Sequence, residues 1–298
     1  SRAAVVGWPA LPRHVQVALE LAEVGVAIDS RDRRCADAAF WLDLRVSWRV
    51  VATSQPGTSH TSSGKPCEDS SWAQVHQTAG GLPLLSVFVC DGAGSASHGG
   101  RGADEAIQAA AKYLEKYVAQ VEFGLNDEWA VGCVTAVREH IYQLAAAAGL
   151  VARDFACTFL GVIVLPTAAL AFQVGDGGIV LDAGQGLELA VEPMSGEYAN
   201  MTHFVTDDDA VTVLKSRVYQ TPVTKVAAFS DGLQRLALNM AANTPHDPFF
   251  APFYKVLSSV GEGKEDELTA ALVDFLNSDR VNERTDDDKT LALALLPS

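Results

Sequence analysis

Residues 84–92 read LLSVFVCDG, an apolar run that stops at Asp91 and a glycine. A short, continuous apolar run of this kind, closed by a turn signal, is typical of a strand that is buried on both faces. The same ending recurs at residues 223–232 (VTKVAAFSDG), where Asp231 follows a second predicted strand. A third predicted strand, residues 290–296 (TLALALL), comes directly after a run of aspartates. Acids at strand ends are therefore the recurring feature of the chain.

The other predicted elements occur in blocks around these strands. They are strands at 44–52, 156–165, 169–174 and 178–182, and helices at 101–118, 126–148, 233–242 and 265–277, with a polar stretch at 53–65. Asn126 or Asp127 is the expected cap of the second helix, and Gly149 ends it. Because strands and helices do not alternate strictly, the pattern favours a layered α+β fold over a doubly wound parallel sheet.

Residues 1–45 do not resemble the rest of the chain, although residues 14–28 have the pattern of a helix. We interpret this part as an N-terminal extension of unknown role. Residues 46–298 are then expected to form the main domain.

Composition narrows the classes of function. The 298 residues are 48% hydrophobic and carry a formal net charge of −15, which argues against binding to nucleic acid or to an anionic membrane. Five cysteines without CxxC spacing argue against a disulfide framework or a zinc site, and they fit a cytoplasmic location. The longest apolar stretch, residues 159–172, contains Pro166 and is too short to span a bilayer.

Convergence of the acids would have a chemical consequence. A single Asp-Gly pair usually marks a turn, but five acidic sites, most of them beside small residues, lie at the ends or flanks of apolar runs: Glu68-Asp69, Asp91, Asp176, Asp231 and Asp287. Carboxylates that crowd together need a compensating charge, and their oxygens suit Mg²⁺ or Mn²⁺. Two such ions can clamp a phosphate and activate water, so the pattern predicts a metal-dependent phosphoesterase.

In their order and spacing, these residues resemble the metal-dependent protein phosphatase family, type 2C. The matching motifs are Glu68-Asp69, Asp91-Gly92, Gly175-Asp176-Gly177, Ser230-Asp231-Gly232 and Asp287-Asp288-Lys289-Thr290, together with the threonine of Cys157-Thr158-Phe159. The stretch from Gly57 to Asp69 is similar to a bacterial subgroup. The resemblance covers about residues 46–298. It implies a four-layer α-β-β-α arrangement, a central antiparallel β-sandwich between helices, with a metal site at one end.

The resemblance also implies roles for the site residues. Asp91, Asp231 and Asp287 would bind two Mg²⁺ or Mn²⁺ ions directly, and Gly92 would offer its carbonyl. Glu68 and Asp69 would hold metal-bound water or the second ion, and Asp176 would serve an accessory third ion. Metal-activated water would then hydrolyse the phosphomonoester directly, without a phosphoenzyme.

Two positions depart from the family pattern. Gly64 stands where the family has a phosphate-gripping arginine, and the neighbouring Lys65 is a candidate substitute that lacks the guanidinium fork. Ala93 stands where the family often has a histidine that protonates the leaving group, and His60 or His98 is a candidate replacement.

The expected function is therefore a Ser/Thr phosphoprotein phosphatase that opposes a kinase acting on the same target. The two departures leave open a regulator that keeps the fold and binds metal or a phosphorylated partner without hydrolysis. A third hypothesis is that the protein is a small-molecule phosphatase.

Other phosphate-binding and phosphatase motifs fail on spacing. The glycines of residues 57–65 are too far apart for a P-loop, and Pro66 stands where Ser or Thr belongs. Residues 89–97 have Ser97 in place of the last glycine of a dinucleotide-binding turn. None of the cysteines has an arginine six residues later, as a cysteine phosphatase would.

Overall fold

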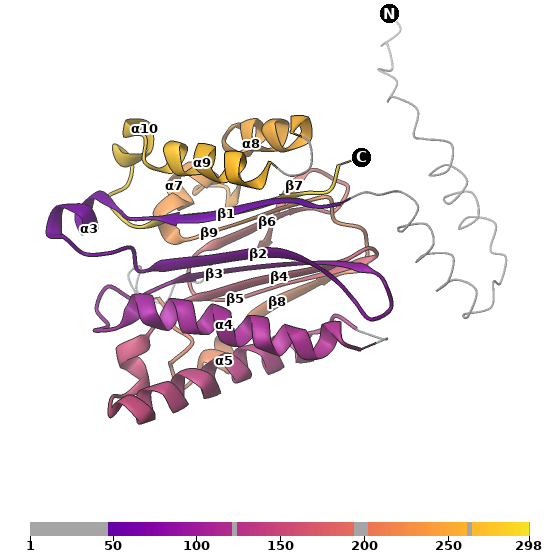
Figure 1. Cartoon of the computed structure of the whole chain (residues 1–298). Helices are drawn as coiled ribbons and strands as arrows, with labels where there is room; N and C mark the ends of the chain where they lie inside the picture. The colour runs from indigo at the N-terminus through magenta and orange to yellow at the C-terminus, as the bar shows by residue number, and fades with distance from the viewer. Residues whose placement is uncertain (1–46, 121–123, 194–201, 261–263, 298) are drawn as a thin grey trace, which may run out of the picture.

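The computed structural model describes residues 47–120, 124–193, 202–260 and 264–297, and it contains two antiparallel sheets stacked face to face (Figure 1). The first sheet has the order β1-β12-β9-β6-β7, with β1 at Arg49–Gln55, β6 at Gly178–Asp182, β7 at Leu187–Val191, β9 at Lys225–Phe229 and β12 at Lys289–Leu295. The second has the order β2-β3-β4-β5-β8, with β2 at Asp69–Gln77, β3 at Pro83–Asp91, β4 at Phe159–Leu165, β5 at Ala168–Val174 and β8 at Lys215–Tyr219.

Helices cover the outer face of each sheet, which confirms the predicted layered α+β sandwich (Figure 1). The long helices α4 (Gly99–Val118) and α5 (Asp127–Ala148) pack on the second sheet. The first sheet is covered by α7 (Gln234–Ala237), α8 (Asp247–Ser259), α9 (Glu265–Leu276) and α10 (Asp279–Asn282). The short elements are α3 (Thr58–Ser63), α6 (Ala210–Val213), the 3₁₀ turns η1 (Ala152–Phe155) and η2 (Asp231–Leu233), and a hairpin of β10 (Leu238–Asn239) and β11 (Thr244–Pro245).

The apolar run at residues 84–90, which forms most of β3, is buried on both faces, as predicted. Along β3, Phe88 and Cys90 face α4 and α5, while Val87 and Val89 face the other sheet. In β12 the leucines pack under the helices and the alanines face the opposite sheet. Alternating burial of this kind places successive residues of each strand in two different cores.

The predicted boundaries hold for the long helices and fail for some short elements. Asn126 caps α5 by accepting a 2.9 Å hydrogen bond from the Trp129 amide, and Gly149 ends the helix in the left-handed conformation. The strand expected at 44–52 is instead β1, Arg49–Gln55, and its first residues lie outside the described ranges. The polar stretch at 53–65 contains the end of β1 and the helix α3.

The helix expected at 233–242 is wrong beyond its first turn. It stops at Ala237 because the chain then pairs Leu238 with Pro245 and Asn239 with Thr244 in the β10–β11 hairpin. The backbone turns back near Asn243, which adopts a positive φ of 51°. Asparagine tolerates this conformation better than most residues, so the turn is locally encoded.

Some predictions fall on residues without a described placement. The helix expected at 14–28 and the domain boundary at 45/46 lie outside the described ranges and stay predictions. Four cysteines, Cys67, Cys90, Cys133 and Cys157, are described and have free thiols. Among the described helices, none combines the length and the apolar character that crossing a bilayer requires.

Candidate metal centre and active site

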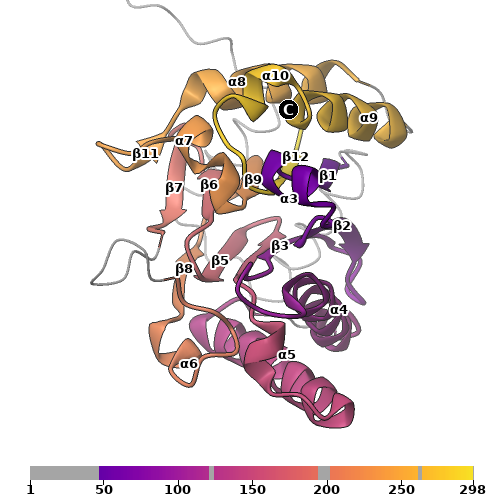
Figure 2. The same cartoon turned by 90° about the vertical axis from the view of Figure 1, so that its left-hand side faces the viewer.

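The predicted acids converge at one end of the sandwich, where the ends of both sheets meet. On the second sheet, Asp69 at the start of β2 lies opposite Asp91 at the end of β3. On the first sheet, Asp231 follows β9, and Asp287 precedes β12. Figure 2 views the molecule from this end, with α3 in front of the strand ends. A cleft of about 220 Å³ opens here, lined by His60, Asp91, Gly92, Ala93, Gly94, Thr158, Asp176, Thr202, Phe204, Asp231, Asp287 and Asp288.

Asp69 ties the two sheets together at the back of this cleft. Its buried carboxylate accepts hydrogen bonds of 2.7 Å from the Ser230 hydroxyl and 2.8 Å from the Thr290 hydroxyl, both on the opposite sheet. Only the Oδ2 atom is used, and Oδ1 is buried without a hydrogen-bond partner among the described residues. Burial raises the pKa of Asp69 to about 7, although the two hydroxyls act in the opposite direction. The free oxygen is therefore available to a proton, to water or to a cation.

Asp91 and Asp231 face each other across the junction between the sheets. Burial, followed by the charges of Asp69 and Asp231, raises the pKa of Asp91 well above its ordinary value. Burial, together with the charges of Asp176 and Asp287, raises the pKa of Asp231 to about 6. Both shifts arise first from burial and then from the charges of the neighbouring carboxylates, and a bound cation would offset both effects.

Asp288 organises the rim of the cleft, a role that the sequence reasoning missed. Its Oδ1 accepts a 2.7 Å hydrogen bond from the Gly57 amide, and its Oδ2 accepts one of 2.6 Å from the Glu68 amide. His60 Nδ1 lies 2.9 Å from Asp288 Oδ2 without the alignment of a hydrogen bond, and His60 Nε2 lies 3.6 Å from Glu68 Oε2. Asp288 therefore fixes both the helix that carries His60 and the segment that carries Glu68. Because the sequence shows only three consecutive aspartates, it gives no sign that the third points inward.

Asp176 and Gly92 also line the cleft. Asp176 lies just beyond β5, and its Oδ2 accepts a 2.5 Å hydrogen bond from the Thr202 hydroxyl, while its backbone carbonyl accepts one from the Gln234 amide group. Gly92 is buried, and its amide donates to the Glu68 carbonyl at 3.1 Å. A Cβ at Gly92 would lie 2.6 Å from that carbonyl, so this close approach requires glycine.

The donor set fits hard divalent cations. The candidate ligands are all oxygens, and Glu68 Oε2, Asp69 Oδ1 and Asp231 Oδ1 are buried without a hydrogen-bond partner in the described part of the chain. Lysine and arginine are absent from the described lining of the cleft, so no side-chain cation other than a protonated His60 offsets the carboxylates there. Buried carboxylate oxygens without partners are costly unless a proton or a cation compensates them.

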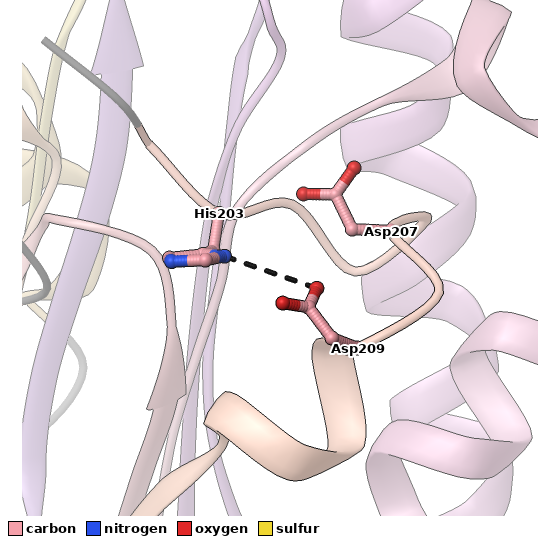
Figure 3. Close-up of side chains that lie close together, drawn as sticks. All are labelled: His203, Asp207 and Asp209. Carbon is pink, nitrogen blue, oxygen red and sulfur yellow. Dashed lines mark ion pairs between the residues drawn. The ribbon is translucent and has the colours of Figure 1, made fainter. Parts of the chain in front are cut away.

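A second group of side chains whose atoms are close enough to share a metal ion lies beside the cleft, and it was not predicted. His203, Asp207 and Asp209 offer ligand atoms that all lie within 4.8 Å of one another. Figure 3 shows His203 facing Asp209, with 3.9 Å between Nδ1 and Oδ1. Among the described residues, the cleft aspartates do not form so tight a group. The segment has no apolar run ending in an acid, which explains why the sequence pattern did not select it.

Of the three residues predicted to contact phosphate or protonate the leaving group, only His60 lines the cleft. Lys65 is exposed beyond the end of α3 and is not part of the cleft lining. His98 stacks on Phe155 with ring centroids 5.2 Å apart and lies 2.9 Å from the Ser97 hydroxyl, also outside the lining. The structure thus separates two candidates that the sequence left equivalent.

Comparison with known proteins identifies the family. Residues 56–277 match the family model described as protein phosphatase 2C. Serine/threonine-protein phosphatase 3 of Escherichia coli strain K12 is 52% identical over 250 residues, which cover 84% of this chain and 99% of that protein. The chain belongs to the protein phosphatase 2C family. This confirms the resemblance drawn from the motifs, and with it the prediction of a metal-dependent protein phosphatase.

Solved structures share the fold of this protein phosphatase 2C chain. The crystal structure of a bacterial serine phosphatase superposes with a TM-score of 0.58 at 13% identity, covering 85% of this chain and 99% of that one. A serine/threonine phosphatase of S. agalactiae gives a TM-score of 0.56 at 15% identity, covering 84% and 100%. At such low identity the likeness establishes the architecture, which confirms the predicted α-β-β-α sandwich.

Proposed function

We propose that this protein phosphatase 2C chain hydrolyses phosphoserine and phosphothreonine in protein substrates, using Mg²⁺ or Mn²⁺ ions held in the cleft. The observation that carries the proposal is the convergence of acids from both sheets, with buried carboxylate oxygens that lack protein partners. Support for the substrate class comes from the relative that is 52% identical and is named a serine/threonine-protein phosphatase.

The proposed roles follow the geometry of the cleft. Asp91, Asp231 and Asp287, with the Gly92 carbonyl, are the proposed direct ligands of two ions. Glu68 and Asp69 are proposed to support the second ion or its water, and Asp176 a third. When bound, the ions supply the positive charge that promotes ionisation of water and stabilises the transferred phosphoryl group. Since neither lysine nor arginine is found in the described lining, we infer that these ions meet most of the charge of the phosphate.

A metal-dependence assay tests the proposal directly. Protein treated with EDTA and then dialysed should release no phosphate from a phosphoserine peptide, and addition of Mn²⁺ or Mg²⁺ should restore release. The proposal is wrong if the metal-loaded protein hydrolyses neither phosphopeptides nor aryl phosphates. Calorimetry that shows Mn²⁺ binding without hydrolysis would instead support the non-catalytic regulator. Hydrolysis of free phospho-compounds alone would support a small-molecule phosphatase.

We propose His60 as the group that protonates the leaving alcohol, because it is the candidate histidine that lines the cleft. In His60→Ala, kcat for a phosphoserine peptide should fall roughly a hundredfold, the lower end of the effect of general acid catalysis. Hydrolysis of p-nitrophenyl phosphate should fall much less, because its leaving group needs no proton. Equal losses on both substrates would contradict the role, and a leaving-group-dependent loss in His98→Ala would assign it to His98.

That a kinase acts on the same target is also part of this proposal. The N-terminal extension at residues 1–45 and the cytoplasmic location inferred from the cysteines stay predictions.

A further inference from the structure

A second and larger cavity, of about 440 Å³, lies outside the cleft, among α7, α8, α10 and the end of α9. Its lining includes three arginines, Arg235, Arg280 and Arg284, and three phenylalanines, Phe249, Phe253 and Phe275. The proposed chemistry uses none of these residues. The combination of a cationic rim and an aromatic wall therefore needs its own explanation.

The arginines form a cationic patch on an acidic protein. All three side chains are exposed, and no carboxylate is among the described residues that line the cavity. In the described part of the chain, several other arginines have partners: for example, Arg217 pairs with Glu188, and Arg138 donates to the Val205 carbonyl. For the guanidinium groups of Arg235, Arg280 and Arg284, no ion pair or hydrogen bond to another described residue is found. Guanidinium groups bind carboxylates through paired hydrogen bonds, so three of them around one cavity favour an anionic ligand.

The aromatic wall adds an apolar requirement. The Phe253 ring meets those of Phe249 and Phe275 edge to face, with centroids 5.4 Å and 4.9 Å apart, and Phe253 and Phe275 are only partly buried. A large apolar side chain that entered the cavity would bury part of these rings, which is favourable. The cavity thus suits an apolar side chain that is flanked by carboxylates, and it is larger than a simple inorganic anion requires.

The patch is built on the same segments as the active site. Arg235 lies in α7, directly after the η2 turn that contains Asp231, and Arg284 comes shortly before Asp287. Figures 1 and 2 both show α10 above α3, at the end of the sandwich where the cleft opens. A peptide bound in the cavity beside α10 would therefore lie near the end of the molecule where its phosphorylated residue must enter the cleft.

We propose that this cavity docks an acidic segment of the phosphoprotein substrate, with one large apolar side chain inserted among the phenylalanines. The proposal rests on the phosphoprotein phosphatase function, and it names a recognition element outside the reacting centre. In this proposal the arginines select the substrate by strengthening its binding. Their loss should therefore raise KM and leave the chemical step unchanged.

The first experiment measures docking without turnover. The probe is a fluorescein-labelled, unphosphorylated peptide, EEFEEFEE, and its binding to the full chain is followed by polarisation in EDTA and low salt. In the double variant Arg280→Gln/Arg284→Gln, the dissociation constant should rise at least about tenfold, because charge-assisted hydrogen bonds are lost. The matched control Arg217→Gln, an exposed arginine on β8, should bind as the wild type does. Equal binding by wild type and double variant, or no binding by wild type at millimolar protein, would overturn the proposal.

The second experiment separates this proposal from the phosphatase function. Two phosphoserine peptides, one followed by EEFEE and the other by GSGSG, are compared in Mn²⁺. The wild type should prefer the acidic peptide about tenfold in kcat/KM, and the double variant should lose this preference through KM. Hydrolysis of both peptides without preference would contradict the docking proposal alone. Binding of the EEFEEFEE probe without any hydrolysis would contradict the phosphatase function alone. If the double variant does not fold, the single charge reversal Arg280→Glu at the exposed α10 gives the same comparison.

Discussion

Asp91→Asn is expected to reduce Mn²⁺-dependent phosphate release roughly a thousandfold, equivalent to about 4 kcal/mol of transition-state stabilisation. Asp91 is a proposed direct ligand and lies between Asp69 and Asp231, so the change removes a charged oxygen from the centre of the site. Asp231→Asn should have an effect of the same order. The measurement is steady-state hydrolysis of a phosphoserine peptide across a Mn²⁺ titration, because a weakened site shows both a lower kcat and a higher metal requirement.

The same variant should stabilise the protein when divalent ions are absent. The raised pKa of Asp91 shows that its charged form is unfavourable in the native state, and asparagine removes that charge. Melting in EDTA at pH 7.5 should therefore give a higher Tm for Asp91→Asn than for the wild type, even though the variant is inactive. A variant that lost activity because it misfolded would melt lower instead.

The raised carboxylate pKa values predict how the free energy of unfolding in EDTA changes with pH. The pKa values of Asp69 and Asp231 rise from an ordinary value of 3.8 to about 7 and about 6, so the native state binds more protons than the unfolded state between about pH 4 and pH 7. The free energy of unfolding in EDTA should thus fall as pH rises through this window. Saturating Mn²⁺ should remove most of the loss at pH 7, since the ions replace the protons. An EDTA-treated wild type that gains stability from pH 5 to pH 7.5 would contradict this account.

Asp182→Asn is the matched control, because it alters a carboxylate at the opposite end of the sheet. Asp182 accepts a 2.7 Å hydrogen bond from Lys225 and others from the Gly184 and Gly186 amides. Burial disfavours the charge of Asp182, but these hydrogen bonds outweigh burial and lower its pKa. The substitution should therefore lower Tm and leave kcat unchanged, the reverse of the pattern expected for Asp91→Asn.

Gly232→Ala should lower the free energy of unfolding by about 3 kcal/mol, the upper end of the cost of overpacking. A Cβ at Gly232 would lie 2.0 Å from the Asp288 carbonyl oxygen, which is backbone and has no rotamer to change. The segment that carries Asp287 and Asp288 must then move, so phosphate release should fall as well. Chemical denaturation with a parallel activity assay measures both effects.

Gly124→Ala provides the control for this substitution. Nothing lies within 4 Å of a Cβ at Gly124, and its φ is not in the left-handed region. The free energy of unfolding of the Gly124→Ala variant should differ from that of the wild type by less than about 0.5 kcal/mol. If Gly232→Ala behaved in the same way, the close packing between η2 and the Asp288 segment would be wrong.

The sequence predicted the parts of the site that follow a buried strand. Apolar runs such as that of β3 are recognisable because both faces are covered, and the acid that ends each run marks the edge of the sandwich. Edge strands gave no such signal. In β2 and β8 most side chains are not fully buried, so polar residues are frequent and the apolar run that marks a central strand is missing.

Local sequence also failed where a contact joins distant segments. The inward position of Asp288 depends on the amides of Gly57 and Glu68, which lie more than 200 residues away in the chain. Helix α8 contains Pro252 in its interior, which argues against a helix, yet burial of its phenylalanines against β9 and β12 outweighs that cost. Such effects depend on tertiary packing, which no short window of sequence contains.

The double hydrogen bond that Asp69 accepts from Ser230 and Thr290 has a consequence for the order of assembly. Asp69 and Asp91 belong to one sheet, whereas Asp231 and Asp287 belong to the other. A chain with only one sheet formed would hold only part of the proposed ligands. If these residues bind the ions, tight uptake of Mn²⁺ is expected only after the two sheets have docked, and it would then report the completion of folding.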